Sequence, residues 1–141
     1  MDTGDGAFAF LAQRNAPGEA AMTDKVVVLV TAGSLREARR IARHLVEARL
    51  AACVNVSAPV ESVFRWQGRI ENGRERLLVI KTARELFPAL QRAIRHLHSY
   101  TTPEIICLPI IDGAADYLEW LGQAVKSAAT DARKGANTQS C

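Results

Sequence analysis

The segment from His98 to Glu104 concentrates reactive side chains in a short stretch of the chain. Its sequence, His-Ser-Tyr-Thr-Thr-Pro-Glu, supplies an imidazole, a phenol, hydroxyls and a carboxylate. An imidazole can bind a transition-metal ion, and carboxylate oxygens can complete such a site. A structural turn needs little more than a Gly or an Asn. We therefore take this segment as the first candidate for a functional site.

Two side chains of this segment are candidate metal ligands, and each has a structural alternative. His98 follows an amphipathic helix, and a histidine at a helix C-terminus can also serve only as a cap. Glu104 opens an apolar strand, where a carboxylate needs a partner: a metal, His98, or a Lys or Arg of a neighbouring subunit. His96 could chelate together with His98 only if the helix ends by Leu97, because residues two apart on a continuous helix point about 200° apart.

Three further side chains are candidates for lining a ligand cleft: Tyr100, Lys81 and Trp66. Tyr100 could instead be packed with its hydroxyl hydrogen-bonded, and Trp66 could be a packing anchor. Lys81 lies in an apolar run, where a salt bridge or a side chain that reaches the surface is the alternative to ligand binding. Both readings stay open for each residue.

Composition indicates one ordinary globular domain. The chain has 141 residues, of which 48% are hydrophobic and 23% charged. Its net charge is only +3 and its eighteen Lys and Arg are spread along the sequence, so we expect no nucleic-acid partner and no membrane anchor. The three cysteines have no metal-knuckle spacing, and without a secretion signal they indicate reduced thiols. We expect a cytoplasmic protein.

Both ends of the chain differ in composition from the middle. Residues 1–24 read as a disordered extension, whose best apolar run, Ala7 to Ala12, is too short for the core of a signal peptide. Met22 leads directly into the first strong apolar run and is a possible true start of translation. Residues 25–126 form the predicted domain, and residues 127–141 a flexible tail.

The first half of the predicted domain reads as a strand, a helix and a long hairpin. Lys25 to Thr31 is a β-branched run suited to a central strand buried on both faces. Ser34 and Glu37 form a capping box that starts a helix. A β-hairpin is then predicted, with one arm from Ala51 to Trp66 and the other from Leu77 to Lys81. Turn residues occur at Gln67-Gly68 and Asn72-Gly73. Pro59 is expected at a bulge or an edge position.

The second half completes the pattern. A second helix cannot start much before Glu85, because Pro88 is tolerated only in a first turn. A strand from Glu104 to Ile111 and a short helix around Tyr117 to Val125 follow. The order β-α-β-β-α-β plus one helix is that of the α+β, ferredoxin-like split βαβ fold: a four-stranded antiparallel sheet with both main helices on one face.

The first arm of the hairpin is too long for this fold alone. Sixteen residues span about 50 Å, against roughly 20 Å for a usual strand. Such a projection would expose Val60, Val63, Phe64 and Trp66, which monomers avoid. We infer that another subunit covers the extended hairpin.

Five separated motifs resemble the CutA divalent-cation tolerance family. They are Leu50-Ala-Ala-Cys53-Val-Asn55, Trp66-Gln-Gly68, Lys81-Thr82, Leu97-His98-Ser-Tyr100-Thr-Thr-Pro103-Glu104-Ile105 and Asp116-Tyr117-Leu-Glu-Trp120-Leu121. The resemblance implies a cytoplasmic homotrimer of ferredoxin-like subunits whose long hairpins pair between neighbours. It also implies binding of Cu(II) or another divalent cation, and a part in metal tolerance.

The resemblance adds Cys53 as a secondary metal ligand, although a small buried apolar role suits it better on composition. Some copper-binding relatives carry a cysteine where this chain has Val30 and a second histidine where it has Leu97. Alternatives from other classes are a PII-like sensor of a small anionic metabolite at the intersubunit cleft, and a stable trimeric scaffold that binds a protein partner. An enzyme is not expected, because no catalytic constellation can be placed.

Overall fold

The computed structural model describes residues 23–127, and most of the predicted N-terminal extension (residues 1–24) and most of the predicted tail lie outside this range. The elements in chain order are β1 (Lys25–Ala32), α2 (Leu35–Glu47), β2 (Cys53–Trp66), β3 (Arg69–Ala83), a 3-10 turn η1 (Arg84–Leu86), α3 (Phe87–Leu97), β4 (Ile105–Pro109) and α4 (Ala115–Ala124). The four strands form one sheet in the order β2-β3-β1-β4, and every neighbouring pair is antiparallel. The predicted α+β, split βαβ fold is confirmed.

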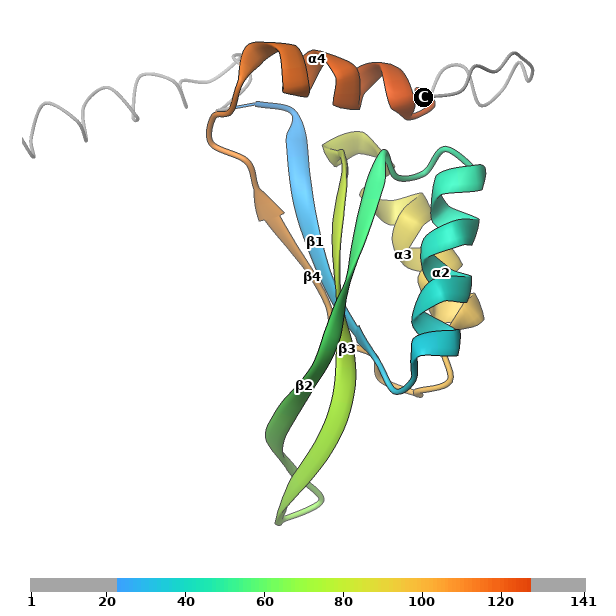
Figure 1. Ribbon diagram of the computed structural model, residues 1–141, viewed down its shortest axis with the longest axis vertical. Coiled ribbons are helices and arrows are strands. Elements are labelled where there is room, and N and C mark those ends of the chain that lie inside the picture. The colour runs from blue at the N-terminus through green and yellow to red at the C-terminus, as the bar shows by residue number, and fades with distance from the viewer. Residues whose placement is uncertain (1–22, 128–141) are drawn as a thin grey trace, which may run out of the picture.

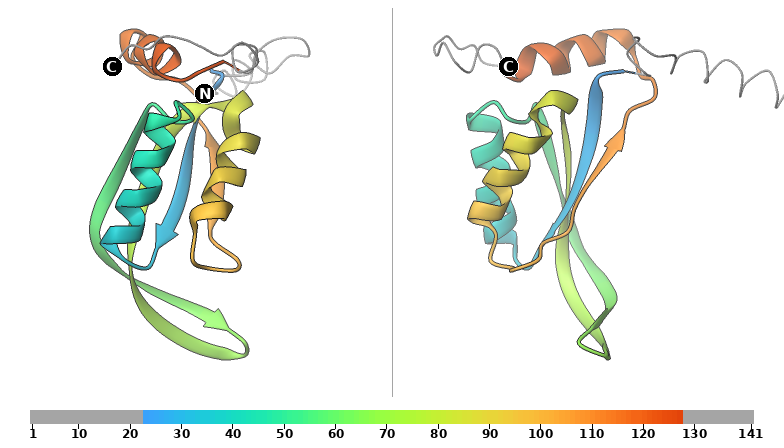
Figure 2. Two further views of the ribbon diagram at one scale, coloured as in Figure 1. Left: turned by 90° about the vertical axis from the view of Figure 1, so that its right-hand side faces the viewer. Right: turned by 180° about the vertical axis from the view of Figure 1, so that it is seen from behind.

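Helices α2 and α3 cover one face of the sheet, as Figure 2 shows. Ser34 caps α2, because its Oγ accepts a hydrogen bond from the Glu37 N–H at 3.1 Å. Pro88 lies in the first turn of α3, where its missing N–H leaves no carbonyl unpaired. Both helices therefore begin where the sequence predicts.

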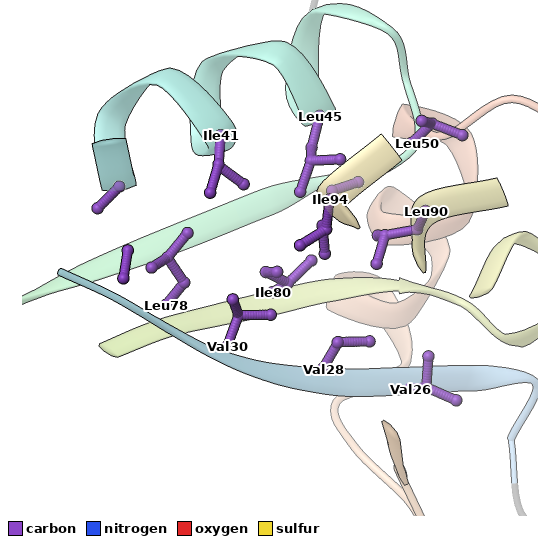
Figure 3. Packing of buried hydrophobic residues seen from close by; sticks show 13 residues of the cluster. Val26, Val28, Val30, Ile41, Leu45, Leu50, Leu78, Ile80, Leu90 and Ile94 are labelled. Atoms are coloured by element: carbon purple, nitrogen blue, oxygen red, sulfur yellow. The ribbon is translucent and has the colours of Figure 1, made fainter. Parts of the chain in front are cut away.

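The core lies between this helix pair and the sheet. Alternate residues of the two central strands point into it, and Figure 3 shows Val28, Val30, Leu78 and Ile80 facing the helices. Four fully buried residues close the core on the helix side: Ile41 and Leu45 of α2, and Leu90 and Ile94 of α3. Cys107 of β4 packs against the edge of this cluster.

The hairpin of β2 and β3 extends past the ends of the helices (Figure 1). It reverses at Gln67 and Gly68, whose φ values of 50° and 79° suit a two-residue hairpin turn. The prediction of turn chemistry at Asn72-Gly73 is wrong, because both residues are paired inside β3. Pro59 sits at a shift of register between Val56 and Pro59 on the edge strand, which confirms the predicted bulge.

The opposite face of the sheet carries no helix (Figure 2). The side chains of β1 that point to this open face, such as Val27 and Leu29, are half-buried, while their neighbours in the core are fully buried. The expectation that β1 is buried on both faces is therefore not met within one chain, although its central position is confirmed. Helix α4 lies across one end of the sheet, where Leu121 and Val125 pack against Ala52, Ala83 and Leu86.

The last strand is shorter and more exposed than expected. It covers Ile105–Pro109 and forms an edge of the sheet, with Ile106 45% exposed. Glu104 precedes the strand and is exposed, so the expectation of a carboxylate at the start of a buried strand is wrong. Within residues 23–127 no helix has the length and hydropathy to cross a membrane.

Candidate functional site

His98 lies at the point where α3 ends and the chain turns into the loop before β4. The residue has extended backbone angles and its N–H donates to the Ile94 carbonyl, so it closes the helix and turns its side chain inward. The imidazole is fully buried. His96, two residues earlier, is exposed, so the two imidazoles do not converge although the helix ends at Leu97.

Both ring nitrogens of His98 have partners. Nε2 lies 2.7 Å from the Thr31 carbonyl oxygen, which can only accept a hydrogen bond. Nε2 therefore carries the hydrogen, and Nδ1 has the lone pair. Nδ1 accepts a hydrogen bond from the Tyr100 N–H at 3.1 Å. The lone pair that a metal would use thus faces the loop and is held by a main-chain donor.

Glu37 joins this loop to the first turn of α2. Its Oε2 accepts a hydrogen bond from the Ser99 N–H at 2.6 Å, its Oε1 accepts one from the Ser99 hydroxyl at 3.1 Å, and Oε2 lies 3.5 Å from His98 Nδ1. The predicted capping box is therefore only half formed. Ser34 caps the helix, but the Glu37 carboxylate binds the loop after α3.

Tyr100 joins the same loop to the hairpin. Its hydroxyl donates a hydrogen bond to Glu75 Oε2 at 2.8 Å, and its ring lies 4.7 Å from the His98 ring. Glu75 also accepts a hydrogen bond from the Ser62 hydroxyl at 2.7 Å, across the pair β2–β3. Burial and the neighbouring Glu75 carboxylate raise the pKa of Tyr100 to about 12, because both disfavour a phenolate.

We call His98, Ser99, Tyr100, Glu37 and Glu75 the histidine loop cluster. Sequence reasoning found His98 and Tyr100 but missed both carboxylates. The spacing of Glu37 from Ser34 predicts a role in helix capping, and Glu75 lies in the hairpin with no local motif. Only the fold brings them beside the loop, since each is more than twenty residues from it in sequence.

The other predicted site residues lie elsewhere in the chain. Cys53 is half-buried and directly opposite Lys81 in the pairing of β2 with β3, and Lys81 is hydrogen-bonded to Asn55. Trp66 is 52% exposed at the hairpin tip. One chain therefore does not bring these residues to His98, and Glu104 has no hydrogen bond or ion pair among residues 23–127.

The donor set of the described residues of one chain is incomplete for a metal ion. Among residues 23–127, no group of three His, Cys, Asp or Glu side chains has the arrangement needed to hold one. The histidine loop cluster supplies one imidazole lone pair and two carboxylates, but hydrogen bonds within the chain hold all three. A transition metal bound here would need further ligands from beyond residues 23–127 or a rearranged loop.

Comparison with known proteins extends the resemblance seen in the motifs. The profile of the family described as CutA1 divalent ion tolerance protein matches residues 26–124. The divalent-cation tolerance protein CutA of Thermus thermophilus is 50% identical over 95 residues, which cover 67% of this chain and 92% of the relative. The corresponding protein of Archaeoglobus fulgidus is 42% identical over 99 residues, covering 70% of this chain and 96% of the relative.

Solved structures agree with these matches. CutA1 from Oryza sativa superimposes with a TM-score of 0.73 at 37% identity, covering 77% of this chain and 100% of that one. The Thermus thermophilus protein gives a TM-score of 0.71 at 46% identity, with 72% of this chain and 99% of that one covered. Both the sequence and the fold match along the whole domain from β1 to α4. The chain belongs to the CutA1 divalent ion tolerance family.

Proposed function

We propose that this protein is a homotrimer that binds Cu(II) or a similar divalent cation weakly at the clefts between its subunits, as part of the tolerance of metal ions. Membership of the family supports a link to divalent ions. The observation that carries the proposal is the orientation of His98. Its Nε2–H donates to the Thr31 carbonyl, while Nδ1 offers its lone pair to the loop.

This arrangement is the one that a metal ligand requires. A histidine that binds a metal almost always donates its other ring N–H to a carbonyl or a carboxylate, which fixes the tautomer and the ring orientation. The Thr31 carbonyl fills that role for His98. A metal at Nδ1 would displace the Tyr100 N–H, and the nearby Glu37 carboxylate would partly balance its charge. The need to break these hydrogen bonds is the reason for expecting weak binding.

The incomplete donor set supports a site between subunits. Cys53 and Glu104 are the remaining candidate ligands, and a neighbouring copy is the simplest source of them. Exposed apolar side chains favour such an assembly: Val63, Phe64, Trp66 and Ile70 lie on the projecting hairpin, and Ile106 and Leu108 lie on the edge strand. A monomer that left these residues in water would be prone to association.

We further propose that the role is non-catalytic and cytoplasmic. In residues 23–127 the histidine loop cluster has no serine, cysteine or threonine nucleophile activated by His98, because both ring nitrogens bind main-chain groups. Relatives differ in location: one CutA structure, from Archaeoglobus fulgidus, is described as periplasmic, and the Arabidopsis thaliana protein as chloroplastic. Fractionation of native cells with an antibody against this protein tests the location.

Calorimetric titration with Cu(II) tests the metal proposal, using protein without a purification tag. We expect saturable binding to the parent protein and its loss in His98→Ala. His96→Ala is the matched control, because His96 is an exposed imidazole two residues away and should leave binding unchanged. Binding that survives His98→Ala, or that disappears equally in His96→Ala, would refute the assignment of His98.

The mass of the assembly in solution tests the trimer separately. Light scattering after size exclusion should give three times the mass of the chain, and a monomer at micromolar concentration would contradict the proposal. If a trimer forms but binds no metal, a thermal-shift screen with small anionic metabolites distinguishes the sensor role from a scaffold role. Stabilisation by one such metabolite, lost in Lys81→Gln, would favour the sensor.

A further inference from the structure

Exposed arginines gather on the outer surface of the two main helices. Helix α2 carries Arg36, Arg39, Arg40 and Arg43 at spacings of three and four, which place them on one stripe. Helix α3 adds Arg92 and Arg95, also exposed. Figure 2 shows α2 and α3 side by side on the same face of the sheet. We call these six residues the arginine face.

The arginine face is largely without counter-charge. Glu37 of α2 binds Ser99 of the histidine loop cluster, and Glu47 forms an ion pair only with Arg43, at 3.6 Å. Arg40 donates to the Leu97 carbonyl at 2.8 Å and so ties α2 to the end of α3. Within residues 23–127, the other four arginines of the face have no carboxylate partner. The two helices therefore present several unneutralised guanidinium groups to solvent.

The side chains around these arginines limit the kind of partner. Within residues 23–127, no exposed large hydrophobic residue lies on α2 or α3. These residues lie on the β2–β3 hairpin, in the loop between α3 and β4, on β4, on α4, or between β4 and α4. A helix that lies on a membrane needs such apolar anchors, and binding of unpaired bases needs aromatic platforms. The arginine face has neither. It is suited to a soluble partner with regularly spaced negative charge and no apolar contact.

The chemistry of the cations favours phosphate. All six are arginines, and the planar guanidinium binds a phosphate through two parallel hydrogen bonds, which the lysine ammonium cannot do. The stripe on α2 runs about 10 Å along the helix axis, because seven residues rise by 1.5 Å each. Packed helices lie about 8–10 Å apart, so α3 adds a second row at a similar distance. Two such rows can contact several phosphates of one backbone at once.

We propose that the arginine face binds the phosphate backbone of duplex nucleic acid without reading its sequence. The proposal is independent of metal binding, and it runs against the expectation from the spread of basic residues along the chain. The fold brings these basic residues together, because it places α3 beside the arginine stripe of α2. The dissociation constant should lie in the range of non-specific binding, about 10⁻⁴–10⁻⁶ M at physiological salt.

Fluorescence anisotropy with a labelled 20-base-pair DNA tests the proposal between 50 and 200 mM salt. If the four arginines without carboxylate partners each neutralise one phosphate, the plot of log K against log salt should have a slope of about −3.6. The double variant Arg39→Gln/Arg92→Gln should change this slope by about 1.8, so that it becomes less negative. Duplexes of different sequence should bind alike.

The matched control is Arg65→Gln/Arg74→Gln, which removes the same charge from exposed arginines of the hairpin. Light scattering must give the same assembly mass for all three proteins. The proposal is overturned if the DNA does not bind, if both double variants weaken binding equally, or if the slope of Arg39→Gln/Arg92→Gln equals that of the parent. Equally tight binding of polyglutamate would also overturn it, because a general acidic partner would then replace nucleic acid.

Discussion

Tyr100 donates a hydrogen bond from its hydroxyl to Glu75 across 2.8 Å, and this contact connects the loop after α3 to the projecting hairpin. The two residues are 25 positions apart in sequence. The same tyrosine donates its main-chain N–H to His98 Nδ1. We therefore expect a movement of the hairpin to reach His98, the residue proposed to bind the metal, through Tyr100.

Tyr100→Phe should loosen the loop without disturbing the core. The variant removes one hydrogen bond to a carboxylate at a residue that is 38% exposed, so the loss of stability should be small, about 1 kcal/mol. Hydrogen exchange should become faster at residues 98–104. Tyr117→Phe is the control, because within residues 23–127 the Tyr117 hydroxyl has no hydrogen-bond partner. Unchanged exchange in Tyr100→Phe would contradict the coupling.

The surroundings of Tyr100 make the stability of the folded protein depend on pH in the alkaline range. The pKa of Tyr100 is raised from 10.0 to about 12 by burial and by Glu75, so the folded protein holds this proton more tightly than the unfolded chain does. Its contribution to stability is complete below pH 10 and is lost as the pH rises towards 12. Denaturation at pH 9, 10 and 11 should show a steeper loss for the parent than for Tyr100→Phe. Parallel curves for the two proteins are the outcome that rejects this prediction.

Glu37→Gln should weaken the attachment of the loop to α2. The carboxylate accepts two hydrogen bonds from Ser99, at 2.6 and 3.1 Å, and an amide can accept them only with its single oxygen and without charge. We expect a loss of about 1–2 kcal/mol in the free energy of unfolding. Chemical denaturation at one protein concentration measures it. Glu47→Gln, an exposed position whose ion pair is screened by water, should change stability by less than about 0.5 kcal/mol.

The sequence predicts the framework of the fold much better than the surroundings of His98. Strands and helices follow from local patterns: the β-branched run of β1, the Ser34 cap and Pro88 in a first turn all act within a few residues. The partners of His98 depend on contacts between distant elements, since Thr31 and Glu37 lie 67 and 61 residues earlier in the chain. Local periodicity contains no information about such pairs. The same limitation explains why the sequence alone predicts only a capping role for Glu37.

The expectation for Glu104 fails for a related reason. An apolar run such as Ile105 to Ile111 reads as buried, but the position of a strand within a sheet is set by the whole topology. Strand β4 lies at the edge, and its Ile106 and Leu108 point to the face without helices. These residues become buried only if something beyond residues 23–127 covers them. Their apolar character is therefore information about assembly as much as about the core.

Thr82 provides a test of the buried polar contacts that hold β3 to the segment between α2 and β2. Its hydroxyl is fully buried and donates to the Leu50 carbonyl at 2.6 Å. Thr82→Val keeps the shape of the side chain and leaves that carbonyl unpaired, which should cost about 1–3 kcal/mol. Thr31→Val is the control, because within residues 23–127 the Thr31 hydroxyl makes no hydrogen bond. Equal stability of the two variants in urea denaturation would show that the Thr82 contact contributes nothing.

Ile106→Glu tests whether the open face of the sheet is a contact between subunits. Ile106 is 45% exposed in a single chain and pairs with Leu29 in the centre of that face. A carboxylate there would remain hydrated in a monomer but would be buried without a partner in an assembly, which costs several kcal/mol for each copy. We expect the mass in solution to fall to that of one chain while circular dichroism stays the same. His96→Glu adds a negative charge on the helix side and should leave the mass unchanged; an Ile106→Glu protein that keeps the parent's mass would place the subunit contact elsewhere.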